Sequence, residues 1–470
     1  MNSPVMAIRF GTSGWRAIIA DEFTFDNVRR VVKAVAAHIT EQGNTPNAKI
    51  IVGFDTRFMG EQFAALSSEV LKSYGFQVLL CDSPTPTPVI SHAIRHEKAV
   101  GGLNFTASHN PPQYQGIKFS TADGAPALPN VTQKIEELVK KADLSETVSN
   151  SGGTIENYNP RETYFADLRG KIRFDVIRQA GKSYVYDPLW GTGRGYLNEI
   201  LQQEGLEVQT IHDWRDVTFG GRAPEPSEDN VAELRQLVLE KGCILGLATD
   251  GDGDRFGVLD ADGSFITANQ LIAILTDYMA ESRGWTEGVA RSVATSHLVD
   301  RVARDRGLKL YETPVGFKYI GEMIVNDQII LGGEESAGLS IKGHLPEKDG
   351  ILACLLAAEA VAARGASLTE QLNNIYARVG RIESGRIGVR LTPEIAAALS
   401  QKLSQEPTMI GNRRVAEINR TDGVKFLFAD GSWLLMRPSG TEPLVRVYAE
   451  TENLPDLEVL LEQGRQYLLA

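Results

Sequence analysis

The hydrophobic pattern alternates between amphipathic helical stretches and short, continuous apolar runs. Near the N-terminus, five β-branched residues share one face at helical spacing: Val28, Val31, Val32, Val35 and Ile39. Thr24 and Asp26 precede this face as candidate N-caps. The apolar run at 49–54 is short and uninterrupted, which is typical of a strand buried on both faces of a sheet. This part of the chain therefore predicts a helix followed by a buried strand.

This order of helix and strand recurs three times. The strands of the three copies are predicted over 49–54, 77–81 and 99–104, over 183–186, 206–211 and 243–248, and over 291–295, 308–311 and 329–331. Strands that alternate with helices predict parallel sheets, whose ligands bind beyond the carboxyl ends of the strands. In each copy the third strand runs directly into a polar segment. We therefore expect the segments 106–112, 250–254 and 333–336 to lie at binding sites.

The pattern changes after about residue 366. Strands predicted between residues 382 and 449 alternate polar and apolar positions, and helical stretches at 393–403 and 457–468 accompany them. This indicates a smaller α+β domain built on an antiparallel sheet. The predicted fold class is thus α/β, with three related α/β domains of mixed, mainly parallel sheets and a C-terminal α+β domain. The predicted domains are 1–150, 151–262, 263–370 and 371–470, with a linker rich in Ser, Gly and Asn at 145–158.

Length and composition agree with several soluble domains. A chain of 470 residues exceeds what one hydrophobic core usually serves. The net charge of −12 argues against a nucleic-acid scaffold and a basic membrane-surface protein. Three widely spaced cysteines exclude a disulfide framework and a zinc-thiolate site, and they fit a reducing cytoplasm. We see no signal peptide, and the apolar run 351–363 contains Glu359, which favours a buried helix over a membrane span.

The segment 250–254 carries three aspartates, Asp250, Asp252 and Asp254, separated by single glycines. Carboxylates this close repel one another unless a cation neutralises them. All-oxygen ligation favours Mg²⁺, Mn²⁺ or Ca²⁺ over zinc. An EF-hand is excluded, because its sixth position is Arg255 and its twelfth is Ala261. We predict a metal loop in which Arg255 steers a phosphate toward the metal; a solvated acidic turn is the alternative.

The segment 106–112 places Ser108 before His109 and two stiffening prolines. A hydrolase triad is disfavoured, because a base next to its nucleophile in sequence reaches it poorly and no G-x-S-x-G elbow is present. If Ser108 carries a phosphate, the metal loop has a clear function, because its metal neutralises the transferring phosphoryl group. We predict Ser108 as a phosphate-carrying nucleophile, with an ordinary turn as the alternative reading of the loop alone.

Two further segments have the chemistry to hold a phosphorylated sugar. Residues 333–338 combine two carboxylates with a hydroxyl, which suits sugar hydroxyls. Residues 437–443 with Arg446 offer hydroxyls, backbone N–H groups and arginines, which together make a phosphate cradle. Glycine motifs for dinucleotides fail, because residue 196 is Tyr, and no Walker-type P-loop exists in the sequence. The segment 11–16 predicts a turn, unless Arg16 points into a cleft.

These segments, in this order, resemble those of the α-D-phosphohexomutase superfamily: phosphoglucomutases, phosphomannomutases and phosphoglucosamine mutases. Residues 106–111 resemble its phosphoserine loop, 250–255 its metal loop, 333–338 its sugar-binding loop and 437–443 its phosphate-binding loop. The resemblance covers essentially the whole chain and implies four domains around a central cleft. It also implies an intramolecular phosphotransferase in which phosphorylated Ser108 donates to a hexose monophosphate. The resulting hexose 1,6-bisphosphate reorients, and its other phosphate returns to the serine.

The resemblance also implies roles for single residues. Lys118 matches a candidate general base, which requires nearby charge to lower its pKa. Arg16 and His109 match positions that support the phosphoserine, and Glu334 and Ser336 match residues that hold the sugar's 3- and 4-hydroxyls. The implied metal ligands are Ser108, Asp250, Asp252 and Asp254. Further implied substrate contacts are Arg255, Gly316, Lys318, Lys348, Arg437, Ser439, Gly440, Thr441 and Arg446.

The implied cofactors are Mg²⁺ and a hexose 1,6-bisphosphate activator. The expected partner is a phosphorylated hexose, with no nucleic acid and no membrane, and the expected assembly is a monomer or weak homodimer. Residues 334–338 resemble the glucose-type loop, which favours interconversion of glucose 1-phosphate and glucose 6-phosphate. Residues 110–116 differ from the longer, glycine-rich loop of phosphoglucomutases, which is compatible with a hexose 1,6-bisphosphate synthase. A catalytically silent sugar-phosphate-binding protein is the third hypothesis.

Overall fold

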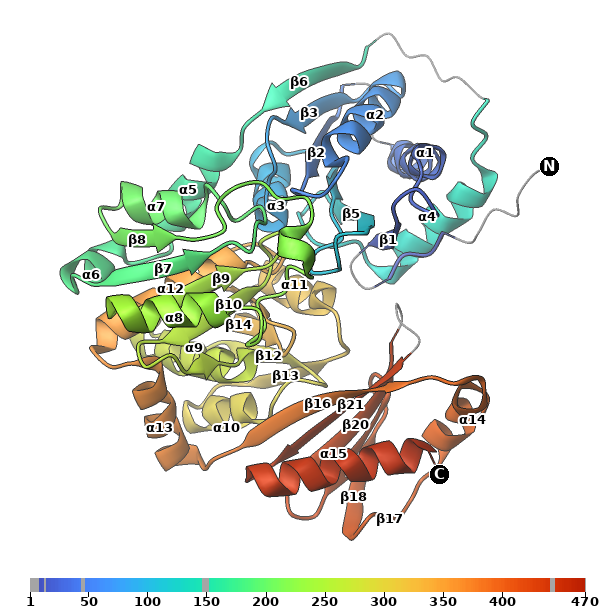
Figure 1. Cartoon of the computed structure of the whole chain (residues 1–470). Coiled ribbons are helices and arrows are strands. Elements are labelled where there is room, and N and C mark those ends of the chain that lie inside the picture. Colours follow the sequence, from blue (N-terminus) through green and yellow to red (C-terminus); the bar gives the residue numbers. More distant parts are fainter. Residues whose placement is uncertain (1–7, 12–13, 44–46, 146–151, 440–443, 470) are drawn as a thin grey trace.

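The computed structural model describes residues 8–11, 14–43, 47–145, 152–439 and 444–469. Within these residues the strands form four sheets, which follow one another along the chain (Figure 1). The first three share one topology and the fourth differs, as the hydrophobic pattern predicts. We refer to them as the first to fourth units.

The first sheet has the order β1-β5-β4-β2-β3-β6. Its strands are β1 (Trp15–Ile18), β2 (Lys49–Phe54), β3 (Gln77–Cys81), β4 (Gly101–Phe105), β5 (Tyr114–Thr121) and β6 (Thr154–Tyr158). The helices around it are α1 (Phe25–Glu41), α2 (Gly60–Ser73), α3 (Thr87–His96) and α4 (Pro129–Lys141). Ile50 and Val52 pack with α1 and α2, whereas Ile51 packs with α3. The strand β2 is therefore buried on both faces, because its apolar run is continuous.

Local signals explain where the first helices begin. Thr24 caps α1, since its side-chain hydroxyl accepts a hydrogen bond from Asn27 N at 3.3 Å. The predicted helical face lies buried on this helix. The helix α2 begins at Gly60, and Glu61 places a negative charge in its first turn, which suits the positive end of the helix dipole.

The second and third sheets have the orders β11-β10-β9-β7-β8 and β13-β12-β14-β15. The strands of the second are β7 (Ser183–Asp187), β8 (Glu207–Thr210), β9 (Leu245–Thr249), β10 (Phe256–Asp260) and β11 (Phe265–Ile266). Those of the third are β12 (Gly288–Ser292), β13 (Leu310–Thr313), β14 (Ile329–Glu334) and β15 (Gly338–Ile341). The second unit has α5 (Arg161–Arg169), α6 (Phe174–Gln179), α7 (Leu197–Gln203), a 3₁₀ turn η1 (Phe219–Gly221) and α8 (Ala232–Lys241). The third has α9 (Ala268–Arg283), α10 (Leu298–Asp305), α11 (Phe317–Val325), α12 (Gly350–Arg364) and α13 (Leu368–Val379).

The three sheets repeat one arrangement of strands. In each, the three predicted strands are parallel and the first lies between the second and the third. In each, an antiparallel strand follows the third: β5 after β4, β10 after β9 and β15 after β14. The sequence predicted the parallel strands and missed these antiparallel partners. The sheets are consequently mixed, and the tight connection to the added strand is where the predicted segments lie.

The helix α12 joins the second and third units. Its residues from Gly350 to Val361 are buried, and it packs against β9, β10 and β15. One hydrophobic cluster therefore extends across both units. This confirms the buried helix predicted over 351–363. Among the described helices no single one is long and apolar enough to span a membrane, and only α12 and α13 together, bent by 76°, pass a test of length and composition.

The fourth sheet is antiparallel, with the order β16-β21-β20-β19-β18-β17. Its strands are β16 (Glu383–Arg390), β17 (Met409–Ile410), β18 (Arg413–Asn419), β19 (Val424–Phe428), β20 (Trp433–Pro438) and β21 (Leu444–Thr451). Its helices are α14 (Pro393–Ser404) and α15 (Leu454–Leu469). The helix α15 packs against β16, β20 and β21, while Trp433, Leu435 and Tyr448 pack against the third unit. This unit is the predicted α+β domain.

The predicted linker at 145–158 and the predicted boundary at 370 both overlap structural elements. The strand β6 lies in the predicted linker at 145–158 but pairs in parallel with β3, so the first sheet extends to Tyr158. Its side chains are polar and largely exposed at the sheet edge, which is why the sequence resembles a linker. The helix α13 crosses the boundary predicted at 370 and packs on α9 and α10. Leu372 and Ile375 give it an apolar face that belongs to the third unit.

Candidate active site

The three predicted segments occupy the same position in three related units. Residues 106–113, the serine loop, connect β4 to β5, and residues 250–255, the aspartate loop, connect β9 to β10. Residues 335–337 connect β14 to β15 within the segment 333–338, the sugar loop. Each connection follows the carboxyl end of a parallel strand, where ligands of such sheets bind. The repeat therefore brings all three segments to the same end of their sheets.

Ser108 is held in an uncommon conformation. Its φ is 53°, in the left-handed region that few residues other than glycine adopt. Its N–H donates to Thr106 Oγ1 at 2.8 Å, and its side chain is buried. Ser108 Oγ donates to Asp250 Oδ2 at 2.9 Å and lies 3.4 Å from His109 Nδ1. The predicted nucleophile and the aspartate loop are therefore in direct contact.

The aspartate loop packs closely against the serine loop. A Cβ atom on Gly251 would lie 2.6 Å from the Ser108 carbonyl oxygen, so only glycine fits at this position. Gly253 has a φ of 71°, which also favours glycine. Gly251 O in turn accepts from Thr192 N at 3.0 Å, which ties the loop to its own unit. The single glycines between the aspartates are thus required by packing and by backbone conformation.

The three aspartates fit a divalent cation. One carboxylate oxygen of each of Asp250, Asp252 and Asp254 lies within 4.8 Å of the others, and all three residues are buried. The Oδ1 atoms of Asp252 and Asp254 are buried and have no hydrogen-bond partner among the described residues. Burial, and then the charges of the other two aspartates, hold the pKa of Asp250 well above its ordinary value. Buried, unpartnered carboxylate oxygens suit Mg²⁺, which prefers oxygen ligands.

Two lysines from neighbouring units compensate part of this charge. Lys118 Nζ donates to Asp252 Oδ2 at 2.6 Å and to Asp254 Oδ2 at 2.7 Å. Lys348 Nζ donates to Asp254 Oδ2 at 2.7 Å. Burial lowers the pKa of Lys118, but Asp252 and Asp254 outweigh burial and raise it above the ordinary value. In this arrangement Lys118 is therefore a paired cation rather than a free base.

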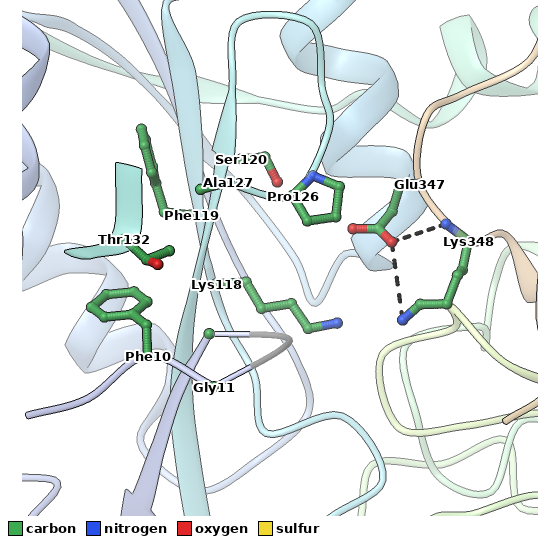
Figure 2. A pocket seen from close by; sticks show the side chains of 11 residues that line it. Phe10, Gly11, Lys118, Phe119, Ser120, Pro126, Ala127, Thr132, Glu347 and Lys348 are labelled. Carbon is green, nitrogen blue, oxygen red and sulfur yellow. Dashed lines mark hydrogen bonds and ion pairs between the residues drawn. The ribbon is translucent and has the colours of Figure 1, made fainter. Parts of the chain in front are cut away.

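Lys118 and Lys348 also line a small cavity next to the aspartate loop. Figure 2 shows both side chains reaching into it from opposite walls, with the carboxylate of Glu347 on the Lys348 side. Glu347 Oε1 accepts from Lys348 N at 2.9 Å and lies 4.0 Å from Lys348 Nζ. Phe10 and Gly11 form part of the opposite wall. The N-terminal segment of the first unit therefore closes one side of the site.

Two arginines, Arg16 and Arg255, bring positive charge to this region. Arg16 Nη1 donates to Asn110 Oδ1 at 2.6 Å, in the serine loop. Burial and then the charge of Arg255 lower the pKa of Arg16 to about 10. Burial and then Arg255 also hold the pKa of His109 well below its ordinary value, so its imidazole is neutral at pH 7. Arg16 therefore contacts the serine loop, and arginines in this region are suited to an anion.

The sugar loop carries its carboxylates in two different settings. Glu334 Oε1 accepts from Gly316 N at 2.7 Å, and burial followed by the charge of Glu335 raises the pKa of Glu334 to about 7. Glu335 Oε2 accepts from Ser292 Oγ at 3.0 Å. Lys318 Nζ lies 5.4 Å from the ring of Tyr319 and belongs to the same stretch as Gly316. Glu334 is thus held by the backbone of its own unit.

Ser336 and Arg255 line a cavity of about 270 Å³ between the second, third and fourth units. Side chains of the fourth sheet form the opposite wall of this cavity: Arg386, Trp433 and Tyr448. Arg386 on β16 is the register partner of Tyr448 on β21. Two residues predicted to bind substrate therefore face one cavity, and the fourth unit contributes an arginine that the sequence did not indicate.

The structure describes only part of the segment 437–443, which the sequence predicts to bind phosphate. Arg437 Nε donates to Asp422 Oδ2 at 2.9 Å, and Ser439 N donates to Leu444 O at 2.8 Å. Arg437 and Arg446 are register partners on β20 and β21, so both lie at the base of the hairpin that carries this segment. The predicted contacts Gly440 and Thr441 lie outside the described residues. Among the described residues, the hairpin places the two arginines together.

Family models for the four domains of phosphoglucomutase/phosphomannomutase match this chain in order. Those for α/β/α domains I, II and III match residues 7–146, 162–263 and 267–379, and the model for the C-terminal domain matches residues 387–463. The chain belongs to the phosphoglucomutase/phosphomannomutase family. As a member of this family within the α-D-phosphohexomutase superfamily, it is a phosphotransferase that shifts phosphate within a sugar.

Individual relatives match over nearly their whole length. A phosphoglucomutase/phosphomannomutase from Thermococcus kodakarensis is 28% identical over 464 residues, which cover 98% of each chain. A protein of Methanosphaera stadtmanae, named "probable phosphoglucosamine mutase", is 31% identical over 467 residues, also covering 98% of each. A crystal structure from Thermus thermophilus, named "putative phosphomannomutase", is 33% identical with a TM-score of 0.87 and full coverage of both chains. The family's multidomain fold is therefore this chain's fold.

Some residues of this family member's site were missed by sequence reasoning. Arg57 and Asp55 follow the end of β2 and contact the serine loop from inside the first unit. Thr87 at the start of α3 donates to Asp252 Oδ2 through its hydroxyl. A signal did exist for Asp55 and Arg57, because polar residues directly after a buried parallel strand lie at the ligand end of a sheet. Nothing local to Thr87 distinguishes it from an ordinary helix start.

Proposed function

We propose that this enzyme interconverts hexose 1-phosphate and hexose 6-phosphate, with glucose as the preferred sugar. The phosphoryl group moves between Ser108 Oγ and the sugar, and a hexose 1,6-bisphosphate is the intermediate. In one half-reaction the bond from phosphorus to Ser108 Oγ breaks as a bond to a sugar hydroxyl oxygen forms. In the other half-reaction the opposite phosphate returns to Ser108. A hexose 1,6-bisphosphate that escapes would leave the serine bare, which explains the need for that compound as activator.

The observation that carries this proposal is the contact between Ser108 and the aspartate loop. Ser108 Oγ lies 2.9 Å from Asp250 Oδ2, so a phosphate on the serine would meet three buried aspartates. Phosphate next to carboxylates is repulsive without a cation. Mg²⁺ held by Asp250, Asp252, Asp254 and the phosphoserine would neutralise the charge on the transferring group. The oxygen-only donor set supports this assignment.

The surrounding charges support a phosphorylated substrate. Arg16 and Lys348 approach the aspartate loop, which itself carries Arg255, and all three cations suit phosphate oxygens. A general-base role for Lys118 requires a neutral amine, so it requires another cation to compensate Asp252 and Asp254. His109, neutral and 3.4 Å from Ser108 Oγ, is a second group able to exchange a proton there. We therefore assign removal of the proton from the attacking sugar hydroxyl to Lys118 or His109.

Recognition of the sugar is assigned to the third unit and that of the distal phosphate to the fourth. Glu334 offers a carboxylate and Ser336 a hydroxyl for sugar hydroxyls, with Gly316 and Lys318 beside them. Arg437, Ser439, Gly440, Thr441 and Arg446 are the proposed cradle for the phosphate that is not being transferred. A sugar bound between the two ends would expose either phosphate to Ser108 after it turns around. Different units thus bind the two ends of the substrate.

A product assay tests the proposal. The purified enzyme is incubated with Mg²⁺, a trace of glucose 1,6-bisphosphate, and glucose 1-phosphate, mannose 1-phosphate or glucosamine 1-phosphate in turn. We expect the 6-phosphates to form, fastest from glucose, while the bisphosphate stays at its starting level. Preference for glucosamine 1-phosphate would replace the sugar assignment, in line with the name of the Methanosphaera stadtmanae relative. Net accumulation of bisphosphate from a second sugar bisphosphate would indicate a synthase, and no conversion of any sugar would contradict the proposal.

A further inference from the structure

Arg57 is buried beneath the serine loop, and every N–H of its side chain donates a hydrogen bond. Its Nη2 donates to the carbonyl oxygens of Ser108 and Asn110, each at 2.6 Å. Its Nη1 donates to those of Pro111 at 2.8 Å and Tyr114 at 3.1 Å. Its Nε donates to the Asp55 carboxylate at 3.1 Å. An arginine side chain has five N–H donors, so this fork is fully used.

Three of these four carbonyl oxygens, those of Ser108, Asn110 and Pro111, belong to the connection between β4 and β5 and lie outside the ladder of these two strands. Pro111 O has a second donor, Tyr114 N at 3.1 Å, and Tyr114 itself begins β5. A buried carbonyl without a partner destabilises the folded loop. Ser108 adds to this, because a left-handed φ is unfavourable in a residue other than glycine. The loop conformation therefore depends on a donor that reaches several carbonyls at once.

The position of Arg57 is itself fixed from two sides. Asp55 accepts from the Arg57 backbone N–H at 2.9 Å as well as from its side chain, and both side chains are fully buried. The guanidinium lies over the ring of Phe219, at 4.9 Å from its centroid. Phe219 belongs to the second unit, which also carries the aspartate loop. Arg57 thus links the serine loop to the unit that opposes it.

We propose that Arg57 is a positioning residue, which holds Ser108 Oγ against the aspartate loop by gathering the carbonyl oxygens of the serine loop. It contacts neither the reacting oxygen nor the sugar, and it acts through the backbone of Ser108. Its planar fork is essential, because a lysine has the charge but presents its donors from one point. The inference rests on the proposed phosphoryl transfer for its effect on turnover, and on the structure alone for its effect on the loop.

The test compares R57K with R283K. Arg283 is also an ion-paired, largely buried arginine, donating to Glu359 and to the Lys171 carbonyl, but it lies at the end of α9 away from the site. In R57K we expect kcat to fall about 10–100-fold, as for a misplaced reacting group, with KM for the sugar monophosphate within about twofold. We expect amide hydrogen exchange in 105–118 to accelerate in R57K and to remain at the wild-type rate in R283K. Thermal midpoints of both variants report the general cost of losing a buried arginine.

Separate outcomes overturn the inference. Wild-type exchange in 105–118 together with wild-type kcat in R57K would exclude a positioning role. Equal losses of kcat in R57K and R283K would assign the effect to stability. If R57K does not fold, the same measurements are made on D55N, which weakens the support of Arg57 but keeps its guanidinium. The amide exchange rate of D55N in 105–118 should lie between the wild-type rate and that of an unprotected chain. The wild type could also lack mutase activity while R57K still exchanges faster than wild type in 105–118. This result would refute the proposed function but leave the positioning role of Arg57 intact.

Discussion

The serine loop and the aspartate loop occupy the same place in two copies of one topology, yet they are held in different ways. The carbonyl oxygens of the serine loop are gathered by Arg57, from within the same unit. The charge of the aspartate loop is compensated by Arg255 of the loop and also from outside its unit, by Lys118 of the first and Lys348 of the third. The repeated fold thus fixes where a loop lies, whereas the charge balance of the site forms only when three units pack together.

The two loops should therefore respond differently to substitutions. A loop held by its own unit should keep its shape when a single functional side chain is removed. A loop whose charge is balanced by neighbours should respond to any change in those charges, because like charges at short distance repel strongly in a buried site. The following predictions test this distinction, beginning with the largest expected effect.

Replacing Ser108 with alanine should abolish turnover without disturbing the serine loop. Arg57 binds the Ser108 carbonyl, which alanine retains, so the loop keeps its support. We expect kcat to fall by at least about three orders of magnitude, as for loss of a covalent nucleophile. The measurements are the mutase assay and the intact mass, in which the phosphorylated form should disappear.

The matched control is S91A. Ser91 is a buried serine of the same unit whose hydroxyl donates to the Gly124 carbonyl. Its loss should cost stability but preserve the phosphorylated form and most of the turnover. Residual phosphorylation of S108A at wild-type stoichiometry would move the nucleophile to another residue.

Replacing Asp252 with asparagine should weaken the response to Mg²⁺. Asp252 has one buried carboxylate oxygen without a partner among the described residues and another bound by Lys118. We expect at least about a 100-fold loss of Mg²⁺-dependent turnover, since metal-site substitutions cost that much even beyond the direct ligands. Mg²⁺ should also raise the thermal midpoint of the wild type more than that of D252N, by linkage.

The control for this prediction is D262N, in the exposed turn between β10 and β11 of the same unit. D262N should retain the wild-type Mg²⁺ titration. Removal of Mg²⁺ by a chelator should lower wild-type turnover to the level of D252N. An unchanged Mg²⁺ midpoint in D252N would show that the aspartate loop is not the metal site.

The sugar loop extends the comparison to the third copy, because Glu334 is held by Gly316 N of its own unit. With a pKa raised to about 7, Glu334 is mostly protonated at pH 6 and mostly ionised at pH 8. A carboxylate accepts hydrogen bonds from sugar hydroxyls better than the acid does. We therefore expect Glu334 to lower the wild-type KM up to about tenfold from pH 6 to pH 8. In E334Q this dependence should be absent.

The substrate phosphate itself titrates near pH 6, so the ratio of the E334Q and wild-type KM values is the quantity to measure. This ratio should rise with pH, because only the wild type gains a carboxylate. E322Q, on the exposed side of α11, is the control and should follow the wild type. A ratio that does not change between pH 6 and pH 8 would remove Glu334 from sugar binding.

The parts of this molecule that sequence predicts are those set by local pattern. The three parallel strands of each unit follow from continuous apolar runs, and Ser108 and Asp250 follow from their place after a third strand. The contact between these two residues depends on packing between units, which no local pattern contains. Arg57 could be noticed after β2, but its four carbonyl partners lie more than about fifty residues away, so its role required the loop's shape. The general-base role implied for Lys118 requires a lowered pKa, whereas the two carboxylates opposite it raise the pKa.

The smallest predicted effect concerns a second lysine that depends on a neighbouring unit. Lys425 of the fourth unit is buried against the third, where its Nζ donates to the Val293 carbonyl at 2.8 Å and lies 4.0 Å from the Trp433 ring. Other groups that face it, charged or titratable, are Arg291, His297, Asp300, Glu312 and Glu450. Burial and then Arg291 lower the pKa of Lys425 to about 7. The folded protein therefore holds fewer protons than the unfolded chain between pH 7 and the ordinary lysine pKa of 10.5.

Stability contributed by this site should therefore rise with pH above 7, because the unfolded state binds the additional proton. The slope for one group is at most about 1.4 kcal/mol per pH unit. K425M has no proton to release, so the free energy of unfolding of the wild type minus that of K425M should increase from pH 7 to pH 9. Calorimetry of the transition that includes the fourth unit measures this difference, and K309M, an exposed lysine over the Tyr311 ring, should show no such trend. A difference that does not change between pH 7 and pH 9 would mean that Lys425 stays charged, and that the carboxylates facing it offset its burial as Asp252 and Asp254 do for Lys118.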